Sequence, residues 1–440
     1  MKKLLGQKHC WHWSKMEQVL KYFEEISKIP HCSANADGLK NYIVNFANEN
    51  GFSVEVDDVK NIVCYKDKRN FALQCHYDMV CIGDAPKLEL VKNGNILSAK
   101  NSSLGADNGI GVAMMLALME EGSELEYVFS ADEEIGLIGA KAIEIELKAQ
   151  KMINIDSETE GDVYIGCAGG IDIPASIELD FIDIDIKNMN TFEVTVDGLP
   201  GGHSGIDIDK NTPNAIKLLS HWIYLNGAKI VSFEGGERRN SIARSAKAIV
   251  VLEKDFKMID VENVKYFKIK SESKVIKQSS QIINMLHNFK HGVREFNEKI
   301  GVVQTSINLA QLFTKENRVE VALTARSMDN EDLISLAKET IKFVNKYGFN
   351  STEEDYYSAW KPETSEFTED VLGVMKKRFE NAELKALHAG LECAVFKEKY
   401  PKMQIASIGP NIFHPHSDRE YVELDSIDRV FSSLKSLVQI

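Results

Sequence analysis

Acidic and histidine side chains follow three apolar runs in the first part of the chain. His76 and Asp78 end the run FALQCHYD, two positions apart and therefore on one side of a strand. Glu133 and Glu134 come directly after EYVFSA, and Asp156 ends KMINID. The carboxyl ends of neighbouring strands in an open α/β sheet are where such folds bind their ligands. If the three runs are strands, we expect these side chains to gather at one sheet edge.

Two further side chains of the same types have similar surroundings. Asp107 lies in the glycine-rich stretch SSLGADNGIG before an apolar helix, and His416 follows the apolar run QIASIGP in FHPHSDRE. Alone, Asp107 could equally cap that helix, and a single histidine is more often a satisfied or exposed residue than a ligand. Convergence favours a metal site, because imidazole and carboxylate without thiolate suit zinc, manganese or cobalt. Two histidines with at least three carboxylates suffice for two ions about 3.5–4 Å apart.

The elements around these residues predict two domains. In residues 1–187, helical stretches such as SKMEQVLKYFEEISKI alternate with short apolar runs, which is typical of an α/β domain with helices on both faces of a mainly parallel sheet. In residues 188–365, alternating strands such as TFEVTVDGL and VEVALTARSMD accompany two helices and indicate an inserted α+β domain. The α/β pattern resumes in residues 366–440, which complete the first domain. The stretch 254–300, rich in Lys and Ser, shows no recognisable pattern.

The composition limits the partners and the compartment. The 440 residues carry a formal net charge of −14, whereas nucleic acids and anionic membranes require a basic face. Seven scattered cysteines without a CxxC pair suit a reducing cytosol better than a disulfide framework. The start MKKLLGQKHCWHW lacks the apolar core of a signal peptide, and no run reaches the roughly 18 apolar residues of a membrane span. We therefore expect a cytoplasmic protein without nucleic-acid or membrane partners.

Several motifs together resemble the M20 metallopeptidases, most closely their aminoacyl-histidine dipeptidase group. They occur in the family's order over essentially the whole chain: HYDMV, SSLGADNGIG, SADEEIGLIGA, NIDSETEGDVYIGCAGG, GLPGGHSGIDI, HAGLECAVF and HSDRE. The resemblance implies five metal ligands, which are His76, Asp107, Glu134, Asp156 and His416. His76 and Asp156 would bind one ion, Glu134 and His416 the other, and Asp107 would bridge them before a cis peptide bond. The ions would be zinc, with manganese or cobalt as alternatives.

The same resemblance assigns the chemistry. Glu133 would be the general base that deprotonates a metal-bridging water, and Asp78 would orient His76. His203, in the GGHSG loop of the inserted domain, would stabilise the oxyanion, although from the loop alone a turn histidine is the simpler interpretation.

Three residues match positions that hold the substrate's carboxylate end or backbone. They are Asn240, Arg326 and Gly390. An arginine suits a free carboxylate because its guanidinium binds it bidentately, although Arg326 could also be a surface residue after a strand.

We therefore expect a metallo-dipeptidase that hydrolyses unblocked dipeptides, Xaa-His included, as a homodimer paired through the inserted domain. The alternatives are a tripeptidase, an N-acyl amino acid amidohydrolase, or a non-catalytic peptide-binding descendant. The last is disfavoured because all five ligands and Glu133 are present. One departure from the family pattern is HSDRE, which has Asp418 where a proline is usual. His414 competes with His416 as a ligand, and the His-Ser order favours His416.

Overall fold

The computed structural model describes residues 15–439 and divides the chain into two compact units. Unit 1 comprises Met1–Ile165, Glu363–Lys385 and Val395–Ile440, and unit 2 comprises Gly166–Pro362 and Ala386–Ala394. His9, Cys10 and His12, and with them the segment considered for a signal peptide, lie outside the described residues. Within residues 15–439 no helix is long and apolar enough to cross a membrane.

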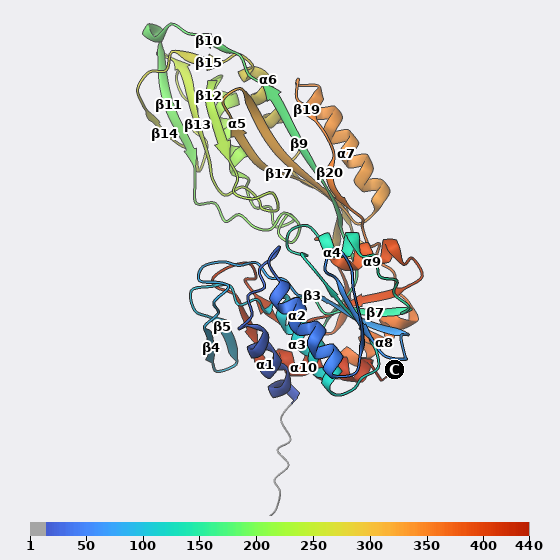
Figure 1. Ribbon diagram of the computed structural model, residues 1–440. Coiled ribbons are helices and arrows are strands. Elements are labelled where there is room, and N and C mark those ends of the chain that lie inside the picture. The colour runs from blue at the N-terminus through green and yellow to red at the C-terminus, as the bar shows by residue number, and fades with distance from the viewer. Residues whose placement is uncertain (1–14, 440) are drawn as a thin grey trace, which may run out of the picture. The chain divides into compact units, whose positions relative to one another are not determined.

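Unit 1 is built on an eight-stranded sheet (Figure 1). Across the sheet its strands are β1 (Ser53–Val56), β2 (Ile62–Tyr65), β6 (Glu126–Ser130), β3 (Phe71–His76), β7 (Lys151–Asn154), β22 (Gln404–Ser407), β8 (Asp162–Cys167) and β21 (Glu383–Leu387). The four central strands, β6, β3, β7 and β22, are parallel, whereas β1, β2 and β8 run antiparallel to their neighbours. A smaller sheet has the order β23 (Ile412–Phe413), β24 (Tyr421–Glu423), β5 (Ile96–Ala99) and β4 (Leu90–Asn93).

Both faces of the large sheet are buried. The helices of unit 1 are α1 (Lys15–Ile26), α2 (Asp37–Glu49), α3 (Ala106–Glu120), α4 (Ile138–Ala142), α8 (Glu366–Met375), α10 (Leu424–Leu437) and, from Val395 on, α9 (Glu392–Lys399). One core joins α1, α2, α3, α8 and α10 to alternate strand residues such as Leu73 and Phe129. The intervening residues, such as Ala72 and Val128, are buried on the opposite face. The predicted α/β class is confirmed.

Unit 2 contains a ten-stranded antiparallel sheet and three helices. Along the sheet lie β14 (Lys265–Lys268), β11 (Met189–Val196), β13 (Ala246–Glu253), β12 (Lys229–Gly235), β17 (Val302–Thr314), β18 (Arg318–Ser327), β9 (Gly169–Glu178) and β19 (Asn350–Ser351), with β16 (Gly292–Asn297) on β17 and β20 (Glu354–Tyr357) on β9. The helices are α5 (Ala215–Asn226), α6 (Ser279–Asn288) and α7 (Asn330–Asn345). A two-stranded sheet pairs β10 (Phe181–Asp183) with β15 (Lys274–Ile276), so the stretch 254–300 supplies β14, β15, α6 and β16.

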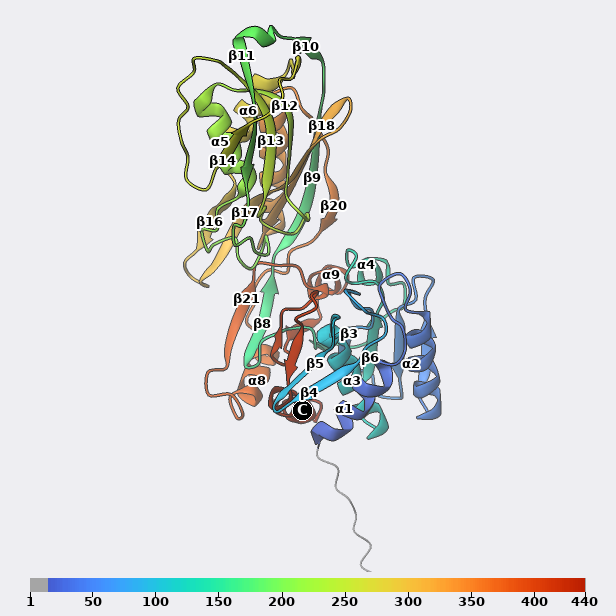
Figure 2. The same cartoon turned by 90° about the vertical axis from the view of Figure 1, so that its left-hand side faces the viewer.

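The two faces of the ten-stranded sheet differ in character, and helix α5 packs on one of them, against β11, β13 and β12 (Figure 2). Along β18, Leu323 and Ala325 join the apolar core that includes α5, α6 and α7. Because side chains alternate along a strand, Thr324 and Arg326 point to the other face. That face is polar in β17, β18 and β9, and the loops 203–207 and 237–241 bond to it.

The boundaries between the two units along the sequence differ from the predicted ones. The first boundary lies at 165/166 instead of 187/188, because β9 pairs with β18 in the sheet of unit 2. The return lies at 362/363 instead of 365/366, and residues 386–394, which include HAGLEC, also belong to unit 2.

Candidate active site

The five predicted metal ligands converge in unit 1 although they come from five separate segments. Their side chains form two groups that could each hold an ion, His76 with Asp107 and Asp156, and Asp107 with Glu134 and His416. His76 Nε2 lies 3.1 Å from Asp107 Oδ1 and 3.3 Å from Asp156 Oδ1. His416 Nε2 lies 3.2 Å from Asp107 Oδ2 and 2.9 Å from Glu134 Oε2. The Asp107 carboxylate therefore faces one group with each oxygen.

The backbone before α3 presents Asp107 to both groups. Gly105 precedes the helix with φ of 70°, and the peptide between Asp107 and Asn108 is cis, as the family resemblance implied. The side-chain amide of Asn108, on the other side of the cis peptide, donates to the candidate ligand Asp156. The glycine-rich turn thus aims both Asp107 and Asn108 into the cluster.

The buried carboxylates of the cluster favour the binding of a cation. Burial opposes the charged form of His416, but Asp107 and Glu134 outweigh it and raise its pKa to about 11. Burial and the nearby Asp107 raise the pKa of Glu134 to about 7, and its buried Oε1 has no hydrogen-bond partner among residues 15–439. A divalent cation would satisfy that oxygen and offset the charge of the carboxylates. The donor set of two imidazoles and three carboxylates therefore fits a pair of hard or borderline divalent ions.

Glu133 lies beside this cluster. With His76 and Glu134 it forms a third group that could hold an ion, in which the ligand atoms lie within 4.8 Å of one another. The Glu133 N–H donates to Asp78 Oδ1 at 3.1 Å. Asp78 also contacts His76, whose Nδ1 is 3.0 Å from the Asp78 carbonyl oxygen and 3.5 Å from Oδ1. The main-chain oxygen of Asp78 is thus the nearer partner that orients the His76 ring.

Residues 31–35 are hydrogen-bonded to the segments that follow strands β3 and β6. Ser33 N–H donates to the Met79 carbonyl at 3.2 Å, and Ala34 N–H donates to Asp132 Oδ1 at 2.6 Å. Asp132, the third acid of SADEEIG, thus anchors this segment. Cys32 forms a disulfide with Cys81, so the expectation that the cysteines are unpaired is wrong for these two. The bond joins the segment to the loop that follows Asp78.

A row of buried polar side chains crosses the four parallel strands just before the ligands. Gln74 donates to Ser130 Oγ at 3.0 Å, and Asn154 donates to Gln74 Oε1 at 2.6 Å. Ser407 Oγ in turn donates to Asn154 Oδ1 at 2.5 Å. Gln74 and Asn154 precede His76 and Asp156 by two residues, so this polar row connects the strands that carry the first ligand group.

The turn that carries His416 is held without the usual proline. Ser417 Oγ donates to the His414 carbonyl at 2.7 Å and accepts from the Arg419 N–H at 3.2 Å. His414 is exposed, packs edge-on against Tyr421 and belongs to neither ligand group. The geometry therefore favours His416, as the motif order does.

In unit 2, four side-chain positions form a continuous row on the polar face of the sheet. Ser306, Arg326, Gly170 and Tyr357 are register partners across β17, β18, β9 and β20. Arg326 is 6% exposed, and its Nη1 donates to Tyr357 Oη at 2.5 Å. A side chain on Gly170 would collide with the Tyr357 ring, so this glycine gives the ring its place. Within the described part of the chain, the buried Nε of Arg326 has no hydrogen-bond partner, which leaves a cationic donor for a ligand.

The other predicted substrate residues surround this row. The Asn240 carbonyl accepts from Ser204 N–H at 2.8 Å, and Ser204 Oγ lies 3.5 Å from Arg326 Nη2. A side chain on Gly390 would press on the Tyr357 ring, at 2.9 Å. His203 Nδ1 accepts the N–H groups of Gly205 and Ile206, each at 3.2 Å. Since backbone N–H groups only donate, His203 carries its proton on Nε2 and presents a donor there.

Three functional candidates were missed by the sequence. His388 is 4% exposed, and its Nε2 is 2.8 Å from Ser306 Oγ. Tyr357 contacts Arg326, and Glu158 lies near the ligand cluster, where burial and Asp107 raise its pKa to about 8. Glu158 could have been found from the sequence, because it lies two residues after the candidate ligand Asp156. Tyr357 and His388 could not, because their contacts depend on which strands pair.

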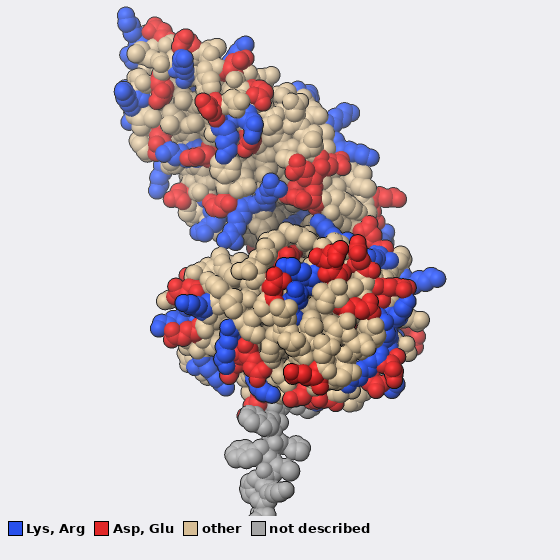
Figure 3. Space-filling model, in the orientation of Figure 1, with Lys and Arg blue, Asp and Glu red and all other residues tan. Residues whose placement is uncertain are grey.

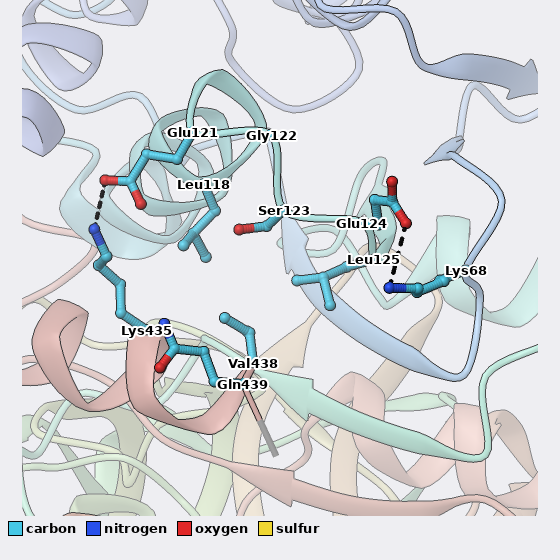
Figure 4. A pocket seen from close by; sticks show the side chains of 10 residues that line it. All are labelled: Lys68, Leu118, Glu121, Gly122, Ser123, Glu124, Leu125, Lys435, Val438 and Gln439. Atoms are coloured by element: carbon cyan, nitrogen blue, oxygen red, sulfur yellow. Dashed lines mark hydrogen bonds and ion pairs between the residues drawn. The ribbon is translucent and has the colours of Figure 1, made fainter.

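A pocket elsewhere in unit 1 has no such chemistry (Figure 4). It is lined by the end of α3 and by the C-terminal residues, with ion pairs from Lys435 to Glu121 at 2.6 Å and from Lys68 to Glu124 at 3.7 Å. Because α3 has 15 residues, this pocket lies about 20 Å from Asp107 at the other helix end. On the surface in Figure 3, acidic and basic side chains are interspersed.

Comparison with known proteins identifies the family of this chain. A family model of M42 glutamyl aminopeptidases matches residues 77–166. The cytosol non-specific dipeptidase of Escherichia coli (strain K12) is 31% identical over 471 residues, covering 95% of this chain and 96% of its own. The chain belongs to the cytosol non-specific dipeptidase family. It is therefore a peptide hydrolase.

Solved structures extend this comparison. The aminoacylhistidine dipeptidase of Vibrio alginolyticus superimposes with a TM-score of 0.78 at 29% identity, covering 97% of each chain. A tripeptidase from Staphylococcus aureus has a TM-score of 0.60 at 16% identity, covering 97% of this chain and 100% of its own. The second likeness concerns the fold alone.

Proposed function

We propose that this chain is an M20 metallopeptidase that hydrolyses unblocked dipeptides, Xaa-His included, with two divalent metal ions. The E. coli and Vibrio relatives, named as dipeptidases, support this substrate class. The observation that carries the proposal is the pair of ligand groups that share Asp107. His76 and Asp156 would hold one ion and Glu134 and His416 the other, and zinc would be the first choice of metal, with manganese or cobalt as alternatives.

When bound, the two ions supply Lewis acidity that polarises the scissile carbonyl and acidifies water. Glu133 removes a proton from the attacking water and later delivers it to the leaving amine. Its position next to the ligand groups supports this role, as does the bond from its N–H to Asp78, which holds the start of the side chain in place.

Unit 2 supplies the residues that recognise substrate. Arg326 binds the C-terminal carboxylate, for which its unpaired buried Nε and its fork geometry are suited. His203 donates from Nε2 to the developing oxyanion. Asn240 and Gly390 shape the surroundings of the substrate backbone. We also propose a homodimer paired through unit 2 and, from the name of the E. coli relative, a cytoplasmic location.

Substitutions in the acidic triplet test the proposal. Glu133→Gln should keep both ions, because it leaves all five ligands intact, yet lose about 10²- to 10⁴-fold in kcat. Glu134→Gln should lose an ion as well as activity. Asp132→Asn is the matched control, since an amide oxygen can still accept from Ala34 N–H. Metal content by atomic emission and hydrolysis of Xaa-His dipeptides are measured on all three.

The outcomes separate the possibilities. Glu133→Gln with wild-type turnover would remove Glu133 from the mechanism, and wild-type protein that binds fewer than two ions would refute the dinuclear site. Parallel assays with tripeptides and N-acyl amino acids decide the substrate class. Faster hydrolysis of either than of dipeptides would replace the dipeptidase assignment.

A further inference from the structure

Glu420 connects the two metal-binding segments that are farthest apart in the sequence. It lies four residues after His416 and is 2% exposed. Its Oε2 accepts the N–H groups of Leu104 at 2.7 Å and Gly105 at 3.0 Å. Its Oε1 accepts those of Ala106 at 2.8 Å and Asp107 at 3.3 Å. One carboxylate thus binds four successive backbone amides, the last of which belongs to the shared ligand.

The turn before α3 needs such a partner. The first N–H groups of a helix have no acceptor within the helix, and a side-chain oxygen at the N-cap normally accepts one of them. Gly105 precedes α3 and has no side chain to do so, and the backbone is again non-helical at Asp107 and Asn108. Glu420 supplies the acceptor, 315 residues further along the chain than Gly105.

The geometry of these four bonds explains why a glutamate suits this position. A single hydroxyl or amide oxygen normally accepts one N–H group at the start of a helix. The carboxylate has the advantage of two oxygens, each of which accepts from two amides and so defines the whole turn.

The backbone of Glu420 is also fixed, by hydrogen bonds within and after the turn that carries His416. Its N–H donates to the Ser417 carbonyl at 3.3 Å, within the turn that contains His416. Directly after it, β24 pairs with β5. Displacing Glu420 would therefore move the Asp107 turn and the His416 turn relative to each other, and with them the 3.2 Å approach of His416 Nε2 to Asp107 Oδ2.

We propose that Glu420 is a positioning residue for the ion held by Asp107, Glu134 and His416. It fixes the distance between the Asp107 and His416 side chains and does not touch substrate, because its carboxylate is fully used by backbone amides. This inference rests on the proposed dinuclear site. It predicts that Glu420 governs metal affinity and kcat, and leaves KM unchanged.

The test compares Glu420→Gln and Glu420→Asp with wild type. Glu420→Gln keeps one acceptor oxygen but turns an amide donor toward backbone N–H groups, whereas Glu420→Asp keeps the charge and both oxygens but shortens the reach. Glu423→Gln is the matched control, since it makes the same change three residues away, where the side chain accepts only from Asn411 at 2.9 Å. Circular dichroism of the metal-free proteins verifies folding.

Titration with Mn²⁺ by calorimetry should show one ion bound about 10- to 100-fold more weakly in Glu420→Gln, the range typical when a partner of a metal ligand is lost. Glu420→Asp should lie between Glu420→Gln and wild type, and Glu423→Gln should equal wild type. The visible spectrum of the Co²⁺ forms should change in the two Glu420 variants only. At saturating metal, kcat should fall and KM should stay the same.

Two results would overturn the inference. One is a folded Glu420→Gln or Glu420→Asp variant with wild-type affinity for both ions. The other is an equal loss of affinity in Glu423→Gln, which would indicate a general destabilisation of the segment. Failure of wild type to bind two ions would instead refute the proposed function, so the two failures are distinguishable.

Discussion

The Cys32–Cys81 disulfide should contribute strongly to the stability of unit 1. The bond closes a loop with a sequence separation of 49 residues. Cross-linking a loop of this length lowers the conformational entropy of the unfolded chain by an amount equivalent to about 4 kcal/mol near room temperature. For a unit of this size, such a change shifts the unfolding midpoint by about 10 °C. The loop contains Asp78 and His76, so its stability concerns the site directly.

The measurement is calorimetric unfolding of metal-free wild type and of the Cys32→Ser/Cys81→Ser double variant, each with and without a dithiol reductant. Wild type should lose about 10 °C on reduction. The double variant should unfold near the midpoint of the reduced wild type and should not respond to the reductant. A thiol count on denatured protein verifies the bond, because two of the seven cysteines should react only after reduction.

An unchanged midpoint on reduction, together with a thiol count that proves the bond was present, would refute the loop-entropy reasoning. A reductant effect of equal size in the double variant would assign the change to another cysteine. A count of seven reactive thiols before reduction would show that the bond does not form.

Three further outcomes are expected. Arg326→Lys and Tyr357→Phe should raise KM for dipeptides about 10-fold or more, because each spoils a charge-assisted contact, while dipeptide amides and the exposed control Tyr356→Phe should show no change. Burial lowers the pKa of His291 to about 4, and its Nδ1 accepts the Leu309 N–H. Because the pKa of His291 is lower in the folded protein than in the unfolded chain, protonation destabilises the folded state. The free energy of unfolding should be highest above about pH 6.5 and fall by roughly 3 kcal/mol toward pH 4. Urea titrations should show a smaller decrease for His291→Gln. Chelation should abolish hydrolysis and lower the unfolding midpoint, and Zn²⁺, Mn²⁺ or Co²⁺ should restore both; an apoprotein with full activity would contradict this.

The strand ends that carry the ligands could be predicted because the signal is local. Apolar runs that end in His76 or Asp156 indicate both a buried strand and a polar residue at its carboxyl end. Since parallel strands meet at one edge, the gathering of these residues follows from the fold class. The assignment of ions and of Glu133 depends on the family resemblance and stays a prediction.

Contacts between distant segments could not be predicted in this way. Neither Glu420 with the Asp107 turn nor Asp132 with Ala34 leaves a trace in spacing or periodicity. The disulfide was missed because cysteine counts indicate a compartment and not the distance between two thiols. The error in the domain boundary was avoidable, because Ile171 and Ile173 in β9 show the alternation of an antiparallel strand.

The polar row of four side chains favours one register of the parallel strands over the others. Its members are Ser130, Gln74, Asn154 and Ser407. Parallel strands made of Val, Ile and Ala residues can pair almost equally well when one slips, and a slip by one residue moves every side chain to the opposite face. A slipped strand would separate these four groups in an apolar interior, at a cost of about 1–3 kcal/mol for each unpaired group. The same slip would turn His76 or Asp156 away from the cluster. Misaligned chains are therefore penalised before any ion binds, which keeps inactive metal-free folds from accumulating.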